Sequence, residues 1–190
     1  MPARQANLVS MRISNPFLQA PSPKLDDIEY MMQAANRAPD HGNLSPYRFI
    51  IVNTEHLKQL GELFLKASQQ EAEISDLQAE KILNMPQRAP MVIISIATLI
   101  EHPKAPKSEQ LITAGIAVNQ LCLAAKELGF DSMWRTGALA YNQTLNTLLN
   151  LAQNEEITGF IYIGTAFKAK KSQPSINVSH LYSVFGDHDE

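Results

Sequence analysis

The sequence predicts one α+β domain of residues 1–190, in which helices lie on a central sheet. Three observations support this fold class. A chain of 190 residues with 45% hydrophobic residues has the usual size of a single domain and is long enough to bury a core. Two runs, 91–99 and 157–165, are almost continuously apolar, as buried strands are. Helical and strand-like segments do not alternate regularly, which favours α+β over α/β.

The composition argues against nucleic acid or a membrane as a partner. Sixteen Lys and Arg stand against nineteen Asp and Glu, so the net charge is −3, and the pI is about 6.0. Such a chain has no overall positive field to attract a polyanion or an anionic bilayer. Any anionic ligand must therefore be held by a local basic pocket.

The expected compartment is the cytoplasm. The first thirty residues lack the basic start, apolar run and small-residue cleavage site of a signal peptide, and no apolar stretch has membrane-spanning length. Cys122 is the single cysteine, so the chain forms no internal disulfide. Its neighbours Leu121, Leu123 and Ala124 predict a thiol buried on a helix.

The first third of the chain predicts two helices and a strand. A short amphipathic segment at 6–11 leads into a proline-bearing connector at 16–23. Apolar residues at helical spacing then predict a helix over 25–37, which Pro39 closes. Residues 47–52 are aromatic and β-branched and predict a half-buried or buried strand.

The middle of the chain predicts two long helices around a central strand. Thr54 is expected to cap a helix over 57–83, whose polar middle is a candidate mobile lid. The run 91–99 predicts a strand that is covered on both faces. Ser108 is then expected to cap a deeply buried helix that Gly129 ends.

The last third predicts two strands and one more capped helix. Residues 130–134 predict a short strand, and Asn142 is placed to cap the helix after it. The run 157–165 predicts a second buried strand. The polar tail ends in Leu181, Tyr182, Val184 and Phe185, which need another surface to pack on, a partner subunit being one candidate.

Common catalytic motifs are absent from the sequence. It contains no glycine-rich phosphate loop, no Cys or His pairs at metal-ligand spacing, and no nucleophile elbow, so no metal site is expected. Polar and basic residues stand instead at three junctions between elements: Arg12 to Ser14, Arg37 to Asn43, and Trp134 to Gly137. An arginine fork matches phosphate oxygens, and a serine two residues later adds a hydroxyl.

Each junction also has a simpler interpretation. Taken alone, Arg12 and Ser14 are typical of a solvated surface or of a helix cap. His41 is likewise typical of a capping or hydrogen-bonding histidine. Only the combination of the three junctions points to a shared ligand.

In order and spacing these segments resemble the short, single-domain branch of the nitroreductase family, over nearly the whole chain. The family opens with an Arg-Arg-Ser motif, and Arg12, Ile13 and Ser14 stand in its place. The other matching segments are Arg37-Ala38-Pro39 with the polar turn to Tyr47, Arg88-Ala89-Pro90 before an apolar strand, the small-residue helix from Ala114 to Gly129, Trp134-Arg135-Thr136-Gly137, and the strand Ile161 to Thr165. Ile13 departs from the family by replacing a basic residue, and Ser45 and Tyr47 replace the usual Gln and Trp.

The resemblance implies the nitroreductase fold, with a mainly antiparallel sheet and an intertwined homodimer that holds FMN at its interface. Arg12, Ile13 and Ser14 would hold the flavin phosphate and ribityl end. Arg37, His41 and Asn43 would reach the flavin across the interface. Trp134, Arg135, Thr136 and Gly137 would lie along the ring, with the Thr136 and Gly137 amides directed at N5 and O4. Chemistry would occur at flavin N5, with no dedicated catalytic side chain.

The expected activity is electron transfer from NADH or NADPH, through FMN, to a nitroaromatic, a quinone or another flat acceptor. The same fold would also suit an enone, free-flavin or dehalogenating reductase. Two further alternatives remain: a flavin-binding or storage protein without turnover, and an α+β domain whose arginines are only surface charges.

Overall fold

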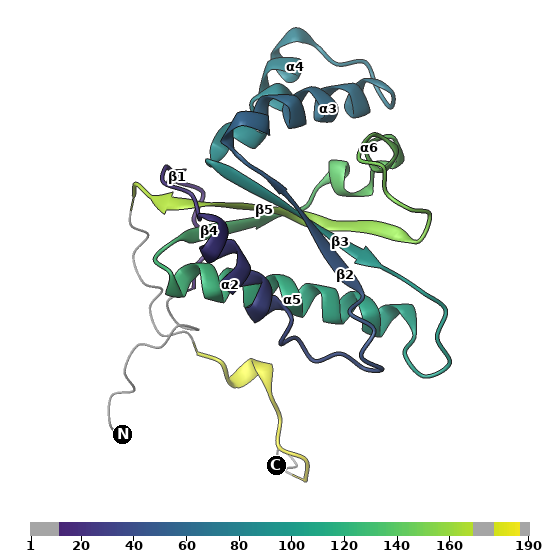
Figure 1. The fold of residues 1–190 in the computed structure, drawn as a ribbon. Coiled ribbons are helices and arrows are strands. Elements are labelled where there is room, and N and C mark those ends of the chain that lie inside the picture. Colours follow the sequence, from purple (N-terminus) through teal and green to yellow (C-terminus); the bar gives the residue numbers. More distant parts are fainter. Residues whose placement is uncertain (1–11, 169–176, 187–190) are drawn as a thin grey trace.

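The fold is a five-stranded sheet with helices on both faces (Figure 1). The computed structural model describes residues 12–168 and 177–186. The strands are β1 (Leu18–Gln19), β2 (Tyr47–Val52), β3 (Met91–Thr98), β4 (Asp131–Arg135) and β5 (Glu155–Ala166). The helices are α2 (Leu25–Ala35), α3 (Leu57–Gln69), α4 (Asp76–Leu83), α5 (Lys107–Glu127) and α6 (Gln143–Leu148). None of the helices in the described ranges has the length and hydropathy needed to cross a bilayer.

The sheet is antiparallel between all its named strands, as predicted. Its order is β1-β5-β3-β2, and β4 also pairs with β5. β3 lies between β2 and β5, and seven of its eight residues are buried. The sequence prediction of a central strand covered on both faces is therefore confirmed.

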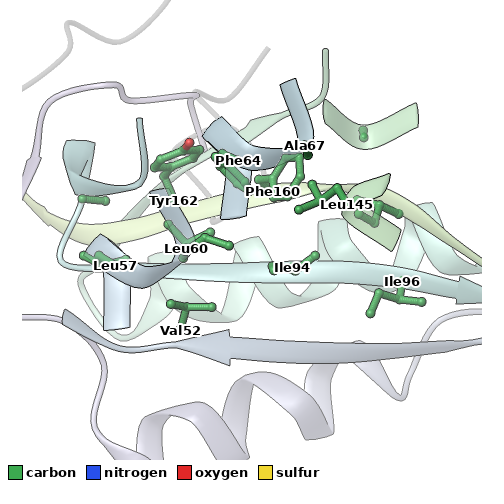
Figure 2. Close-up of a cluster of buried hydrophobic side chains, with 14 of the residues drawn as sticks. Val52, Leu57, Leu60, Phe64, Ala67, Ile94, Ile96, Leu145, Phe160 and Tyr162 are labelled. Carbon is green, nitrogen blue, oxygen red and sulfur yellow. The ribbon is translucent and has the colours of Figure 1, made fainter. Parts of the chain in front are cut away.

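Two hydrophobic cores lie on the two faces of the sheet. On one face α3 and α6 pack on alternate residues of β3 and β5, with Phe64, Ile94, Leu145 and Phe160 at the centre (Figure 2). On the other face α2 and α5 cover a second cluster that includes Cys122. Alternation of side chains along β3 and β5 supplies both cores from the same two strands. The predicted burial of Cys122 is confirmed.

The long helix expected over 57–83 is instead two helices. α3 ends at Gln69, and α4 begins at Asp76 with Ser75 as its N-cap. The Ser75 hydroxyl accepts a hydrogen bond from Gln78 N, while the Gln78 side chain accepts from Ser75 N. This capping box favours a new helix start at Ser75 over continuation of α3.

Two predicted helix caps were wrong and one is confirmed. The Thr54 hydroxyl donates to the carbonyl of Pro90 at 2.6 Å, so it ties the end of β2 to the start of β3. α5 begins one residue before Ser108, with Pro106 as the N-cap. Asn142 does cap α6, since its side chain accepts from Leu145 N at 2.8 Å.

Other boundaries differ by a few residues. The helix predicted over 25–37 ends at Ala35, and the connector predicted over 16–23 contains β1. β1 is only two residues long, so hydrophobic period cannot indicate it; its pairing with the end of β5 makes it a strand. The amphipathic segment predicted at 6–11 lies outside the described residues.

Candidate functional site

Two pockets flank strand β4, one on each face of the sheet. Successive side chains of a strand point to opposite faces, so Trp134 faces α5, whereas Met133 and Arg135 face α3. The Arg12 pocket, on the α5 face, has a volume of about 360 Å³. The Tyr162 pocket, on the α3 face, has a volume of about 420 Å³. Trp134 and Thr136 line both.

The Arg12 pocket combines one cation, small polar groups and an indole. Its lining residues are Arg12, Ser14, Asn119, Cys122, Trp134 and Thr136. None of these described residues is acidic, so an anion in the pocket meets a guanidinium without a competing carboxylate. Burial raises the pKa of the Cys122 thiol, and this outweighs the opposing effects of a hydrogen bond to Ser132 and of the Arg12 charge. Cys122 is therefore a neutral wall of the pocket at pH 7.

A buried asparagine fixes the segment that carries Arg12 and Ser14. Asn15 is fully buried, and its Nδ2 donates to Asp131 Oδ2 at 2.7 Å and to the Lys168 carbonyl at 3.3 Å. Its Oδ1 accepts from Phe17 N at 3.0 Å, and its own N–H donates to the Ser132 carbonyl at 3.0 Å. The segment is thus held against the start of β4, where Ser14 forms a bridge with Ser132.

Asp131 extends this anchor to the end of α5. Its second oxygen, Oδ1, accepts from Lys126 Nζ at 2.6 Å, and Asp131 is buried. A buried carboxylate is stable when both oxygens have partners, as here. The network therefore joins three separate parts of the chain at one edge of the Arg12 pocket.

Trp134 lies flat against β5 because of a glycine. A Cβ added at Gly159 would stand 2.1 Å from the indole Nε1, and Gly159 has φ +151°, which side-chain-bearing residues rarely adopt. Gly159 also lies at the shift of register between Ser95 and Ile96 of β3. The indole donates to the Thr158 carbonyl at 3.2 Å, which fixes its plane as a pocket wall.

The Tyr162 pocket has apolar walls and a cationic rim. Its apolar side chains include Phe64, Met85, Met133, Leu139 and Phe160. Its polar groups come from Arg88, Arg135, Thr136 and Tyr162. The Arg135 guanidinium lies 5.8 Å from the centre of the Tyr162 ring. Burial raises the pKa of Tyr162, although the charges of Arg88 and Arg135 act in the opposite direction.

The outer edge of β4 is open beside both pockets. Beyond Ser132 it pairs with no strand of the described chain. Thr136, which follows β4, makes no hydrogen bond with another described residue. Gly137 has φ +98°, so the chain turns sharply there into the 3-10 turn Ala138–Tyr141. Backbone groups at this edge are therefore available to a ligand.

The structure brings together two of the three predicted junctions. Arg12 and Ser14 share a pocket with Trp134 and Thr136; Arg135 and Gly137 line the other pocket, and Ile13 lines neither. The third junction lies elsewhere and lines neither pocket.

His41 shows how far this third junction is from the Arg12 pocket within one protomer. Its Nδ1 lies 2.7 Å from Glu109 Oε2, near the start of α5. Glu109 precedes Asn119 by about 15 Å along the helix axis. Arg37 is exposed, and Asn43 lies in a turn with φ 54°. Within one protomer these three side chains therefore do not share the Arg12 pocket.

Sequence reasoning missed Asn15, Asp131 and Lys126. A polar residue after Ser14 carries no periodic signal, and burial of Asn15 depends on contacts more than a hundred residues away. Arg88 was noted only as part of the segment before β3. The structure places it at a pocket because the 3-10 turn Pro86–Arg88 packs against α3 just before β3 begins.

Comparisons with known proteins agree with this fold. The model of the Nitroreductase family matches residues 12–165. A relative from Haemophilus influenzae, provisionally named an NAD(P)H nitroreductase, is 36% identical over 85% of this chain and 88% of its own. A nitroreductase-like protein of Bacillus cereus superposes with a TM-score of 0.79 at 19% identity, over 98% of this chain and all of that one. An FMN-dependent nitroreductase of Clostridium difficile superposes with a TM-score of 0.69 at 18% identity, over 95% of this chain and 98% of that one. With a family model that spans most of its length and the same arrangement of helices on an antiparallel sheet, the chain belongs to the nitroreductase family.

Proposed function

We propose that this protein is an FMN-dependent oxidoreductase that uses NADH or NADPH as electron donor. Membership of the nitroreductase family and the names of its relatives support this function. The observation that carries it is the Arg12 pocket, where a guanidinium, a serine side chain and an indole plane meet without an acidic residue.

The residues of the Arg12 pocket fit the chemistry of FMN. Arg12 and Ser14, carried on the Arg12-Ile13-Ser14 segment, bind the phosphate by charge-assisted hydrogen bonds. The segment from Trp134 to Gly137 lies along the ring, and the free edge of β4 offers backbone donors to it. FMN itself supplies the redox chemistry, accepting electrons from the nicotinamide and passing them on.

Hydrogen-bond donors and a cation held beside the flavin ring would raise its reduction potential. The Thr136 and Gly137 amides would face the N5 and O4 edge of the ring, and Arg135 would stand near the side that becomes negative on reduction. Donors and a cation held in place before reaction stabilise that charge without reorganisation. The electron acceptor is a nitroaromatic, a quinone or a similar flat molecule.

The active assembly is a homodimer. In it Arg37, His41 and Asn43 of one protomer reach the Arg12 pocket of the other, which explains why they lie far from that pocket in their own chain. The apolar side chains between Leu181 and Phe185 are exposed, and residues 177–186 extend away from the sheet (Figure 1), as an arm that packs on a partner would.

Anaerobic titration tests the function directly. Purified protein reconstituted with FMN is expected to lose its oxidised flavin absorbance on addition of NADH or NADPH, and to regain it when a nitroaromatic or quinone is added. Flavin that binds but is not reduced by either nucleotide would identify a flavin-binding protein without turnover. Protein that binds no FMN would refute the proposal.

Arg12→Ala tests the phosphate contact. Loss of a charge-assisted hydrogen bond is expected to weaken FMN binding by about 1.5–3 kcal/mol, measured by flavin fluorescence during dilution or dialysis. Lys66→Ala, which removes an exposed cation from α3 away from both pockets, is the control and should retain FMN. Equal retention by both variants would exclude Arg12 from the site.

A further inference from the structure

We propose that the Tyr162 pocket selects electron acceptors that carry a negative charge, binding the carboxylate of an aromatic acid through Arg88 and the Tyr162 hydroxyl. This inference rests on the proposed function, because it names the class of acceptor that the enzyme takes. It rests on the charge, the hydrogen bonding and the walls of the pocket.

The first observation is a pair of arginine side chains that no acidic residue of the described pocket lining neutralises. Arg88 and Arg135 both line the pocket, and no described residue that lines it is acidic. Neither guanidinium forms an ion pair with a carboxylate of the described chain, whereas Arg48 is paired with Glu155 and Lys126 with Asp131. Two positive groups at one cavity attract an anion, and the fork of an arginine matches a carboxylate.

The second observation is a tyrosine hydroxyl that is free to donate into the pocket. Tyr162 is 4% exposed, lines the pocket, and makes no side-chain hydrogen bond within the described residues. Burial raises the pKa of Tyr162, so the hydroxyl is protonated at neutral pH and donates. An oxygen of a bound carboxylate would accept this hydrogen bond from the Tyr162 hydroxyl.

The third observation is the shape and nature of the walls. Phe64, Met85 and Phe160 line the pocket, and Figure 2 shows Tyr162 beside Phe64 within the apolar cluster. A volume of about 420 Å³ suits a small molecule. Apolar walls with a cationic rim favour a flat ring that carries one acidic group over an inorganic anion.

The position of the pocket connects this selectivity to electron transfer. It shares Trp134 and Thr136 with the Arg12 pocket, and Arg135, between these two residues in sequence, lines the Tyr162 pocket. A ring held in the Tyr162 pocket therefore reaches the same segment of β4 along which the flavin ring is proposed to lie. Arg88 belongs to the pocket and not to the proposed flavin contacts, so it separates acceptor selection from flavin binding.

Ligand binding without turnover provides the first test. Trp134 is the single tryptophan, so its fluorescence reports on this pocket. Benzoate is expected to change that fluorescence at saturation, and benzamide, its neutral counterpart, to bind at least about tenfold more weakly. Arg88→Ala should weaken benzoate binding by about tenfold and leave benzamide unchanged. Tyr162→Phe should weaken it by about threefold or more.

Lys81→Ala is the control, because Lys81 is an exposed cation on α4 that does not line the pocket. It should bind benzoate as the unmodified protein does. Equal binding of benzoate and benzamide, or equal losses in Arg88→Ala and Lys81→Ala, would overturn the proposal. This binding test needs no reduction of flavin. Its result therefore distinguishes failure of the acceptor proposal from failure of the proposed reductase function.

Turnover with a matched pair of acceptors provides the second test. In the flavin-loaded enzyme, Arg88→Ala is expected to raise KM about tenfold for 4-nitrobenzoate and to leave KM for 4-nitrobenzamide and the FMN content unchanged. An equal loss with both acceptors, or a loss of FMN, would overturn the proposal by assigning Arg88 to the cofactor. Arg88→Gln, which keeps a polar side chain, guards against a folding defect and should behave as Arg88→Ala does.

Discussion

The shape of the Arg12 pocket depends on a single polar residue, Asn15, that holds the segment carrying Arg12 and Ser14. Arg12 and Ser14 are only half-buried, and neither is fixed by regular secondary structure. Asn15 holds them by bonding at once to Asp131, Ser132 and the Lys168 carbonyl. The geometry of the candidate site therefore depends on a residue that lines neither pocket.

Asn15→Ala is expected to weaken FMN binding as well as stability. It removes the amide that Asp131 and the Phe17 N–H use, at a cost of about 1–3 kcal/mol in the free energy of unfolding. Asn142→Ala is the matched control: it also removes a buried asparagine, the cap of α6, at a cost of about 1–2 kcal/mol. Urea unfolding and flavin retention should separate the two, with only Asn15→Ala losing FMN. Flavin loss in both would mean that instability alone is responsible.

Close packing between α3 and α4 shows why helix propensity fails as a guide to single elements. A Cβ at Gly61 would stand 2.2 Å from the carbonyl oxygen of Leu83. Glycine inside a helix ordinarily costs about 1 kcal/mol relative to alanine. Here it allows the chain after Ser75 to fold back onto α3.

Gly61→Ala is accordingly expected to destabilise the protein, by about 1–3 kcal/mol, although it raises helix propensity. The backbone of α4 must move away to make room. Thermal unfolding measures the effect, with Glu62→Ala, an exposed neighbour on α3, as the control within about 0.5 kcal/mol of the unmodified protein. Stabilisation by Gly61→Ala would contradict the close approach.

An ion pair that spans the sheet predicts acid sensitivity. Arg48 on β2 donates to both carboxylate oxygens of Glu155, at 2.5 and 2.8 Å, across the intervening β3. The Arg48 hydrogen bonds lower the pKa of Glu155 from 4.5 to about 2. A depressed carboxylate pKa stabilises the fold above the unfolded value, and this stabilisation is lost as pH falls from about 4.5 toward 2.

The stability difference between the unmodified protein and Glu155→Gln should therefore be full at pH 7 and shrink below pH 4.5. Urea unfolding midpoints between pH 7 and 3 measure it. Glu62→Gln, at an exposed site, should show no such trend. A difference for Glu155→Gln that stayed constant down to pH 3 would contradict the role of the ion pair.

At the scale of the whole molecule, one exposed face of α5 carries a large apolar side chain. Ile112 is 61% exposed and shares a helix face with Gly115 and Asn119, and Gly115 lies beside the Trp134 indole. This face of α5 thus leads to the Arg12 pocket, which Asn119 lines. A second protomer on this face would cover Ile112 and bring Arg37, His41 and Asn43 to the pocket, as the homodimer proposal requires.

Ile112→Glu is expected to shift the protein from dimer to monomer in sedimentation and to release FMN with it. A carboxylate buried in an apolar interface without a partner opposes association strongly. Leu77→Glu changes an apolar side chain on α4 that is 72% exposed, and this variant should remain a dimer with FMN bound. A dimeric Ile112→Glu protein that retains FMN would place the interface elsewhere.

The sequence alone determined the elements with strong local signals and the family. The apolar runs of β3 and β5, the helix before Gly129 and the cap at Asn142 all follow from patterns within about twenty residues. The order of the Arg12, Arg37 and Trp134 segments carried the resemblance to nitroreductases. The helical spacing of apolar residues alone did not place the break between α3 and α4, although the local capping box of Ser75 and Gln78 marks it.

Tertiary structure alone decided which side chains share a pocket. It joined Asn15 to Asp131, placed Arg88 beside Tyr162, and separated His41 from Arg12 within one protomer. These relations depend on strand pairing between distant segments and on which face of β4 each side chain occupies. Local sequence signals extend over a few turns of helix or one strand, whereas a binding site depends on contacts that only chain folding brings within reach.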